Sequence, residues 1–230
     1  MMKILTLVAI WLVVLAAMAR AQEKPDAKIK ETTPRTVKKA NQRPIVESPK
    51  TVLSEPFAKA SVETMAAQCV KIETEAGNIE LEMFPESAPE SVRSFLNLAA
   101  TGVFDSTTFS RIVKGFIVQG GDLFTRKEIT PEIDKRARQT LPDEPNSIKH
   151  ERGIVSMARA NEPNSASTNF FILVGEARHL DGVFAAFGRV TSGMETVDVI
   201  NKMPVEGEKP TKPIRLNRVT VTSCQAQLKP

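Results

Sequence analysis

The most informative segment of the chain reads Phe109-Ser-Arg-Ile-Val-Lys-Gly-Phe-Ile-Val-Gln-Gly-Gly-Asp122. Alternate residues of a β-strand share one face, so an extended conformation places Arg111 and Gln119 on one side of an otherwise apolar strand. A glycine inside a strand usually marks a bulge, and a kink at Gly115 would bring Phe116 to the same face. The segment therefore predicts an apolar surface with one guanidinium, one amide and one phenyl ring, suited to a neutral and mostly apolar ligand. The alternative is an arginine that extends to solvent from an ordinary strand.

Three later blocks extend this pattern. They read Gly153-Ile-Val-Ser-Met-Ala-Arg-Ala-Asn-Glu-Pro-Asn-Ser-Ala-Ser-Thr-Asn-Phe-Phe-Ile172, His179-Leu-Asp-Gly182 and Val183-Phe-Ala-Ala-Phe-Gly-Arg-Val190. With the first segment they resemble the signatures of the cyclophilins, the peptidyl-prolyl cis-trans isomerases: F-H-R-x-x-x-G-F-x-x-Q-G-G-D, then G-x-L-S-M-A-N-A…S-Q-F-F-I, W-L-D-G and V-F-G-x-V. The only departure inside the first segment is Ser110, where the family usually has histidine. Order and spacing agree from about Val70 to Gln225, which is nearly the whole globular part.

The resemblance implies a mainly β fold, a closed eight-stranded antiparallel barrel with one α-helix covering each end. Patterns in the sequence agree with this expectation. Alternation over residues 70–75 and 79–84 predicts a hairpin, and apolar spacing predicts helices over 89–102 and 193–201. Strands dominate the rest, which favours a barrel. Residues 125–149 are polar without a clear period and are expected to form a surface insertion beside the site.

The reaction of the family suits the first segment. Isomerisation of an X-Pro bond crosses a barrier of about 18–20 kcal/mol, because amide resonance is lost in the twisted state. No bond is broken, so a catalyst needs only to bind the twisted amide better than the planar forms. The proline nitrogen regains a lone pair in that state, which a permanently charged guanidinium with rigid donors can engage. The resemblance implies catalytic roles for Arg111, Phe116 and Gln119, with no cofactor.

The resemblance also implies how the substrate is held. Gln119 holds the substrate backbone, the backbone at Arg159 pairs with the extended peptide, and Ala160 lines the pocket for the residue before proline. Apolar side chains form the proline pocket, namely Phe116, Ile117, Phe171 and Leu180. Taken singly, these apolar positions would also suit an ordinary barrel core.

Three pocket positions depart from the family pattern. Asn169, His179 and Phe184 stand where the family has glutamine, tryptophan and histidine. The shorter Asn169 is expected to weaken a hydrogen bond to the substrate, and the other two alter the rim, so substrate preference and sensitivity to the inhibitor cyclosporin should differ. These changes leave an alternative open, a low-turnover proline-peptide-binding or chaperone module on the same barrel. Arg111, Phe116 and Gln119 favour the isomerase, because a module that only holds peptides does not require all three.

Residues 1–21 have the pattern of a secretory signal peptide. Lys3 supplies the positive start, residues 4–18 the apolar core, and Ala19-Arg20-Ala21 an A-x-A cleavage site. That core is short for a bilayer span, which needs about twenty residues; an uncleaved membrane anchor is the alternative. We therefore expect an exported protein, periplasmic or secreted and similar to bacterial forms of the family, without stable membrane insertion. Its expected role is to assist the folding of exported proteins.

Residues 22–64 are predicted to be a disordered tether rich in proline and lysine, because they lack a sustained apolar period. The remaining residues, 65–230, suit one domain. Of the formal net charge of +4, the signal segment carries +2 and the tether +3, which leaves −1 on the domain. A near-neutral domain gives no reason to expect nucleic acid as a partner. We expect a monomer that binds proline-containing peptides and unfolded protein segments.

Other chemistries lack their residues. The only histidines, His150 and His179, are 29 positions apart and the two cysteines are 155 apart, so no metal-ligand spacing is present and no metal is expected. Ser110 is not part of the G-x-S-x-G turn of a hydrolase. We expect His150 at a surface or turn and His179 at the pocket rim.

The resemblance bears on the two cysteines. In a barrel of this family the first and last strands run antiparallel side by side, which would bring Cys69, before the first strand, near Cys224, at the end of the last. Paired cysteines of exported proteins tend to be bridged. A Cys69–Cys224 disulfide is one expectation, and two unpaired thiols are the alternative.

Overall fold

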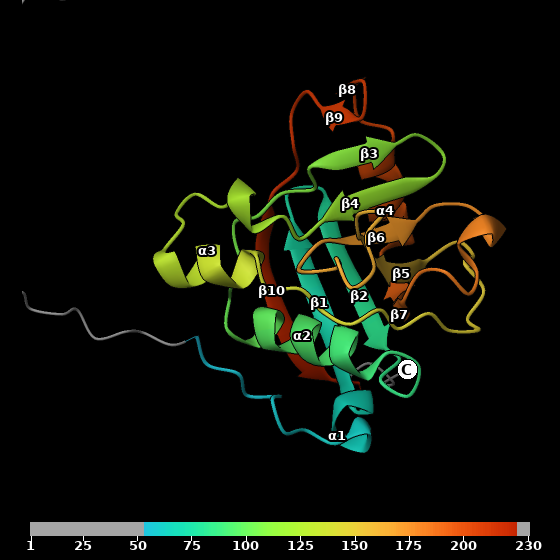
Figure 1. The fold of residues 1–230 in the computed structure, drawn as a ribbon. Coiled ribbons are helices and arrows are strands. Elements are labelled where there is room, and N and C mark those ends of the chain that lie inside the picture. The colour runs from blue at the N-terminus through green and yellow to red at the C-terminus, as the bar shows by residue number, and fades with distance from the viewer. Residues whose placement is uncertain (1–52, 225–230) are drawn as a thin grey trace, which may run out of the picture. The chain divides into compact units, whose positions relative to one another are not determined.

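The computed structural model describes residues 53–224, so the expected signal peptide and most of the expected tether lie outside the described residues. Figure 1 shows the arrangement of the elements. The main sheet contains β1 (Gln68–Thr74), β2 (Gly77–Met83), β3 (Arg111–Val113), β4 (Ile117–Gly120), β5 (Ile154–Met157), β6 (Phe170–Leu173), β7 (Ala186–Ser192) and β10 (Leu216–Ser223). A two-stranded sheet contains β8 (Val205–Glu206) and β9 (Lys209–Pro210). The helices are α1 (Val62–Ala66), α2 (Pro89–Ala100), α3 (Pro131–Ala137) and α4 (Met194–Asn201), with 3-10 turns η1 (Leu123–Thr125) and η2 (Arg178–Leu180).

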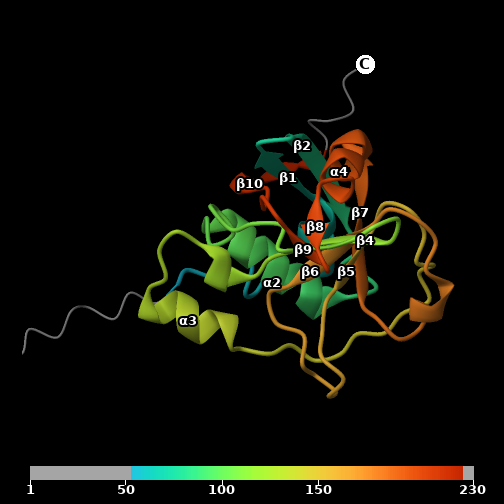
Figure 2. The same ribbon diagram turned by 90° about the horizontal axis from the view of Figure 1, so that it is seen from above.

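The main sheet is antiparallel and curls into a half-barrel. Its strand order is β10-β1-β2-β7-β5-β6-β4-β3, so β10 and β3 are its two edges. Seen from above in Figure 2, the sheet wraps around α2. The expectation of a closed barrel is wrong, because no ladder joins β3 to β10.

Short contacts span the opening between the two edge strands. An isolated bridge pairs Thr108 with Arg215, and the Phe109 N–H donates to the carbonyl of Ile214 at 2.9 Å. Within β3 itself, the Ile112 N–H donates instead to the carbonyl of Glu208, 2.8 Å away, at the turn between β8 and β9. The outer edge of β3 is therefore covered by this hairpin, which prevents a continuous ladder to β10.

The core lies inside the curl, where α2 packs its apolar stripe. The Phe95 ring lies 5.1 Å from Phe104, 5.2 Å from Phe170 and 5.1 Å from Phe187, measured between ring centroids. A second, smaller apolar cluster contains Phe171 and lies on the opposite face of the strands. Because successive residues of a strand point to opposite faces, β6 contributes Phe170 to the core and Phe171 to the other side.

The two helices predicted from apolar spacing, α2 and α4, are confirmed, and two short ones were not predicted. The carboxylate of Glu144 accepts hydrogen bonds from the first N–H groups of α2, those of Glu90 and Ser91, at 2.8 Å each. α3 lies within the segment expected to have no clear period. Its start is set by Thr130, whose hydroxyl accepts from the Ile133 N–H at 3.3 Å, followed by a proline in the first turn. A helix this short carries too few apolar positions to show a period.

The structured domain begins before Met65. The Arg93 guanidinium donates to the carbonyls of Phe57 and Ala60, both at 2.8 Å, and the Phe57 N–H donates to the Asn97 side chain at 2.8 Å. Leu53, Phe57 and Ala60 pack against the core. The expectation of a disordered tether is therefore corrected for residues 53–64, because scattered apolar residues without a period still bind a preformed helix surface. Within the described residues, no helix has both the length and the apolar character needed to cross a bilayer.

His150 is fully buried, which corrects the expectation of a surface or turn residue. Its Nε2 lies 2.9 Å from the hydroxyl of Ser156, and its Nδ1 lies 3.3 Å from a carboxylate oxygen of Asp181. The same carboxylate oxygen accepts the His150 backbone N–H at 2.7 Å. Burial lowers the pKa of His150, and the hydrogen bond from the His150 backbone lowers the pKa of Asp181. These bonds tie the chain after η2 to the sheet.

The first prediction concerns the two cysteines, which the structure joins in a disulfide with their Cα atoms 4.9 Å apart. The bridge links β1 to the end of β10 and closes nearly the whole domain into one loop. Its reduction should lower the free energy of unfolding by on the order of 2–4 kcal/mol. Urea unfolding with and without reductant measures this, and Cys69→Ala/Cys224→Ala is the control that should not respond to reductant. Two free thiols per unfolded, unreduced chain would contradict the prediction.

The second prediction follows from the buried imidazole. Because the pKa of His150 lies below its ordinary 6.5 when folded, the unfolded chain takes up a proton that the folded protein does not. The free energy of unfolding should therefore fall as the pH drops below 6.5, with a contribution of at most about 1.4 kcal/mol per pH unit. The free energy of unfolding, measured in urea between about pH 7 and about pH 5, should change less with pH in His150→Gln than in the unmodified protein. An equal pH dependence of the free energy of unfolding in the two proteins would contradict the role of His150.

Candidate functional site

The segment from Phe109 to Asp122 forms a hairpin, so the expectation of one kinked strand is wrong. β3 ends at Val113, the chain reverses, and β4 begins at Ile117. Gly115 lies in this turn with φ +70°, a left-handed conformation that glycine adopts without strain. The glycine read as a bulge therefore marks a complete reversal of the chain.

The side chain of Asn201, the last residue of α4, holds this turn. Its carbonyl oxygen accepts the Gly115 N–H at 2.9 Å, and its amide donates to the carbonyls of Val113 and Ile117 at 3.0 Å each. Asn201 is 6% exposed, and its bond to the Ile117 carbonyl is buried, whereas the bonds to Gly115 and Val113 are partly buried. The end of α4 thereby fixes the geometry between the two strands that carry the candidate site.

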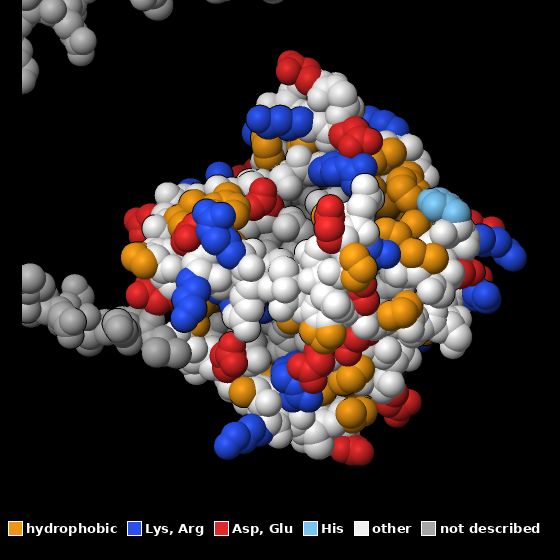
Figure 3. Space-filling model, viewed as in Figure 1, with side chains coloured by type: hydrophobic (Ala, Val, Ile, Leu, Met, Phe, Trp, Pro, Cys, Tyr) orange, Lys and Arg blue, Asp and Glu red, His pale blue; other side chains and the backbone are white. Residues whose placement is uncertain are grey.

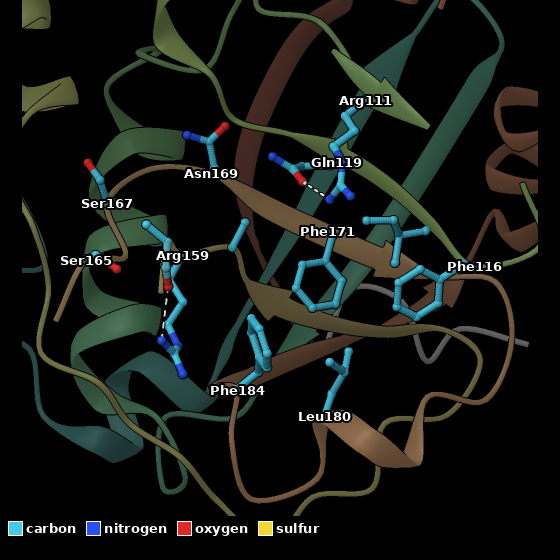
Figure 4. Close-up of a pocket in the computed structure, with 13 residues that line it drawn as sticks. Arg111, Phe116, Gln119, Arg159, Ser165, Ser167, Asn169, Phe171, Leu180 and Phe184 are labelled. Atoms are coloured by element: carbon cyan, nitrogen blue, oxygen red, sulfur yellow. Dashed lines mark hydrogen bonds between the residues drawn. The ribbon is translucent and has the colours of Figure 1, made fainter. Parts of the chain in front are cut away.

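Arg111, Gln119 and Phe171 form one row across three strands. Arg111 is the register partner of Gln119, and Gln119 is the register partner of Phe171. Directly paired residues of neighbouring strands place their side chains on the same face of the sheet. The Arg111 Nη1 donates to the Gln119 Oε1 at 3.1 Å, as Figure 4 shows. The guanidinium and the amide that the sequence placed on one strand therefore meet across a hairpin.

A cavity of about 410 Å³ opens beside this row. In Figure 4 the rings of Phe116, Phe171 and Phe184 converge with Leu180, while Arg111 and Gln119 lie above them. Ten of the eleven residues predicted from the sequence line the cavity: Arg111, Phe116, Ile117, Gln119, Arg159, Ala160, Asn169, Phe171, Leu180 and Phe184. The arrangement offers an apolar floor with a charged donor at one wall.

His179 is the predicted residue that does not line the cavity. It is exposed on η2, and its ring lies 5.6 Å from that of Phe116, between centroids. The rings of Phe184 and Phe171 meet edge-on, with their centroids 6.0 Å apart. The Arg159 guanidinium lies over the face of Phe184, with its central carbon 5.0 Å from the ring centroid. His179 therefore supports Phe116 from outside, whereas Phe184 and Arg159 form the opposite wall.

Three lining residues were missed in the sequence: Ala158, Ser165 and Ser167. Ser167 donates to the carbonyls of Ala137 and Gln139, at 2.7 and 2.9 Å, and so joins the cavity wall to the end of α3. This contact shows that the polar segment 125–149 borders the site, as expected. The small polar residues around Asn164, in the segment from Gly153 to Ile172, could have indicated these lining positions, but no role was predicted for their side chains.

One carboxylate faces the guanidinium. Glu208, in the turn between β8 and β9, accepts a hydrogen bond from the Arg111 Nε at 2.6 Å. This bond and the positive charge of Arg111 lower the pKa of Glu208. On the face seen in Figure 3, Lys and Arg side chains are interspersed with Asp and Glu and form no continuous basic surface. The charged groups at the cavity are therefore the Arg111–Glu208 pair at one wall and Arg159 at the other.

Comparison with known proteins agrees with the fold and the motifs. The family model described as "Cyclophilin type peptidyl-prolyl cis-trans isomerase/CLD" matches residues 69–221. Peptidyl-prolyl cis-trans isomerase CYP18-1 of Arabidopsis thaliana is 39% identical over 155 residues, which are 66% of this chain and 94% of the relative. Peptidyl-prolyl cis-trans isomerase A of Dickeya dadantii is 33% identical over 164 residues, 68% of this chain and 83% of the relative.

A solved structure is also similar. It is a cyclophilin-type peptidyl-prolyl cis-trans isomerase of Cryptosporidium parvum, crystallised in the presence of the dipeptide Ala-Pro. The TM-score is 0.60 at 32% sequence identity, and the match covers 67% of this chain and 99% of that one. The family model matches most of the described domain, and the match covers 83–99% of the relatives and the solved structure, which together show the family. The chain belongs to the cyclophilin-type peptidyl-prolyl cis-trans isomerases.

Proposed function

We propose that this cyclophilin isomerises X-Pro bonds in exported, incompletely folded proteins, with Arg111 as the group that engages the twisted amide. One observation carries the proposal: the Arg111 guanidinium lies at the wall of an apolar cavity, held there by its cross-strand partner Gln119. A charged donor beside an apolar pocket suits a substrate whose proline ring is apolar and whose amide nitrogen becomes basic in the transition state.

The reaction needs little more than this arrangement. Rotation about the X-Pro bond breaks no covalent bond, so the protein has to stabilise the twisted amide relative to both planar forms. A guanidinium N–H directed at the proline nitrogen does so, because that nitrogen accepts a hydrogen bond well only when its lone pair is freed. Arginine stays charged at all relevant pH values, which keeps the donor available. No nucleophile is involved.

The cavity suits an extended peptide. Phe116, Ile117, Phe171 and Leu180 would enclose the proline ring, and the last three are no more than 8% exposed. Gln119 would hold the substrate backbone from the Arg111 side. The backbone at Arg159 would pair with the peptide, with Ala160 beside the residue before proline and Asn169 nearby.

The proposal that the clients are exported proteins has two supports. The first is the signal-peptide pattern of residues 1–21. The second is the pairing of Cys69 with Cys224, because disulfides persist in oxidising compartments and are rare in reducing ones. The alternative, a module that binds proline-containing segments with little turnover, differs from the isomerase only in rate.

The third prediction tests the guanidinium. Arg111→Ala should lower kcat/KM on a short X-Pro peptide by about a hundredfold, the scale for loss of a preorganised transition-state donor worth about 2.7–4 kcal/mol. Isomerisation is measured by exchange NMR, and unfolding in urea should be unchanged because the side chain is 43% exposed. Arg138→Ala, which removes an exposed arginine directly after α3, is the matched control. A parental rate in Arg111→Ala would contradict the role, and a parent that binds the peptide without turnover would favour the binding module.

The fourth prediction concerns the rim. In the family, the tryptophan at the position of His179 contacts cyclosporin, whereas the imidazole here is smaller, more polar and placed outside the cavity against Phe116. Cyclosporin should therefore inhibit the parent weakly, and His179→Trp should strengthen inhibition by about tenfold or more, the scale of one aromatic contact. Inhibition curves on the same peptide decide the point. Tight inhibition of the unmodified protein would show that the rim position is not decisive.

A further inference from the structure

The β8–β9 hairpin lies beside β3, the edge strand that carries Arg111 (Figure 1). Its strands are joined by Gly207 and Glu208, and Gly207 has φ +63°, which permits the tight reversal. The tip is tied to β3, because the Ile112 N–H donates to the Glu208 carbonyl at 2.8 Å. Glu208 is thus placed by a backbone hydrogen bond to the residue that follows Arg111.

The Arg111 guanidinium has two acceptors on two different elements. Its Nε donates to Glu208 at 2.6 Å, and its Nη1 donates to Gln119 at 3.1 Å. A guanidinium carries five N–H donors in one plane. Acceptors at two of its nitrogens restrict rotation of that plane. The other N–H groups have no acceptor among residues 53–224 and remain for a substrate beside the cavity.

We infer that Glu208 is a positioning residue of the isomerase site, which holds the Arg111 guanidinium in the orientation that presents its remaining donors to the substrate amide. The inference rests on the proposed role of Arg111. The Arg111 side chain is 43% exposed, so packing alone leaves it several rotamers. Fixing the donor before the substrate arrives removes that ordering step from the barrier, and small displacements of a catalytic group have large effects on rate.

Because the Arg111–Glu208 ion pair is exposed, a variant that breaks it can test positioning without destabilising the fold. The side chain of Glu208 is 54% exposed, and ion pairs this exposed contribute little to the free energy of unfolding. Loss of Glu208 should therefore change the melting temperature by no more than about 2 °C. Glu206 is the matched control, since it is an exposed carboxylate of the same hairpin that faces Lys209 in the register and has no bond to Arg111.

The experiment compares kcat and KM of Glu208→Ala, Glu208→Gln and Glu206→Ala on one X-Pro peptide, using the folded protein with its disulfide. Glu208→Ala should lower kcat about three- to tenfold with KM within about twofold, because orientation matters most in the transition state. Glu208→Gln should recover most of the loss, since its amide oxygen still accepts from the Arg111 Nε. Glu206→Ala should match the parent. Equal kcat values for Glu208→Ala and Glu206→Ala would overturn the inference.

A second pair of variants shows whether Glu208 acts through Arg111. In the Arg111→Ala background, Glu208→Ala should have no further effect on kcat, because the group that it orients is gone. A full loss in that background would overturn the positioning role while leaving the role of Arg111 intact. Parental activity in Arg111→Ala itself would instead refute the proposed function, and the inference with it. The two failures are therefore distinguishable.

Discussion

The buried side chain of Asn201 is the constraint on which the site depends. Its three hydrogen bonds hold the reversal between β3 and β4, and this reversal sets the register that pairs Arg111 with Gln119. A shift of one strand by one residue would turn its side chains to the opposite face and separate Arg111 from Gln119. Because Asn201 is buried and its bond to the Ile117 carbonyl is shielded from water, loss of the amide would remove a buried hydrogen bond as well as the acceptor of the Gly115 N–H. The last residue of a helix thus controls the geometry of a hairpin more than eighty residues earlier.

The two faces of the sheet explain how a packed domain also presents an apolar cavity. In β4, Val118 joins the core, whereas its neighbours Ile117 and Gln119 face the cavity. The inner face is filled by phenylalanine rings under α2, and this rigid layer supports the smaller cluster on the outer face. The hydrogen bonds of His150 to Ser156 and Asp181 then tie the rim near η2 to that cluster. The apolar side chains that line the cavity are therefore packed separately from the core on the inner face.

Much of this arrangement could be predicted from local patterns. Alternation predicted β1 and β2, and helical spacing predicted α2 and α4, because each of these elements buries one face along its whole length. The motifs predicted ten cavity residues, since the resemblance covers long segments in the same order. The closed barrel was wrong because the outer edge of β3 bonds to the β8–β9 hairpin instead of β10. The short helix α3 left too few residues to show a period.

The sequence by itself determined the family, the residues around the cavity and the elements with a clear period, because these follow from the order and spacing of residue types along the chain. The tertiary structure alone decided that Gly115 reverses the chain, that His150 is buried and that His179 lies outside the cavity. It also decided that Glu208 bonds to Arg111, 97 positions away in the chain. Each of these outcomes depends on contacts between distant segments, and the spacing of residues within one segment does not specify which distant group it will meet.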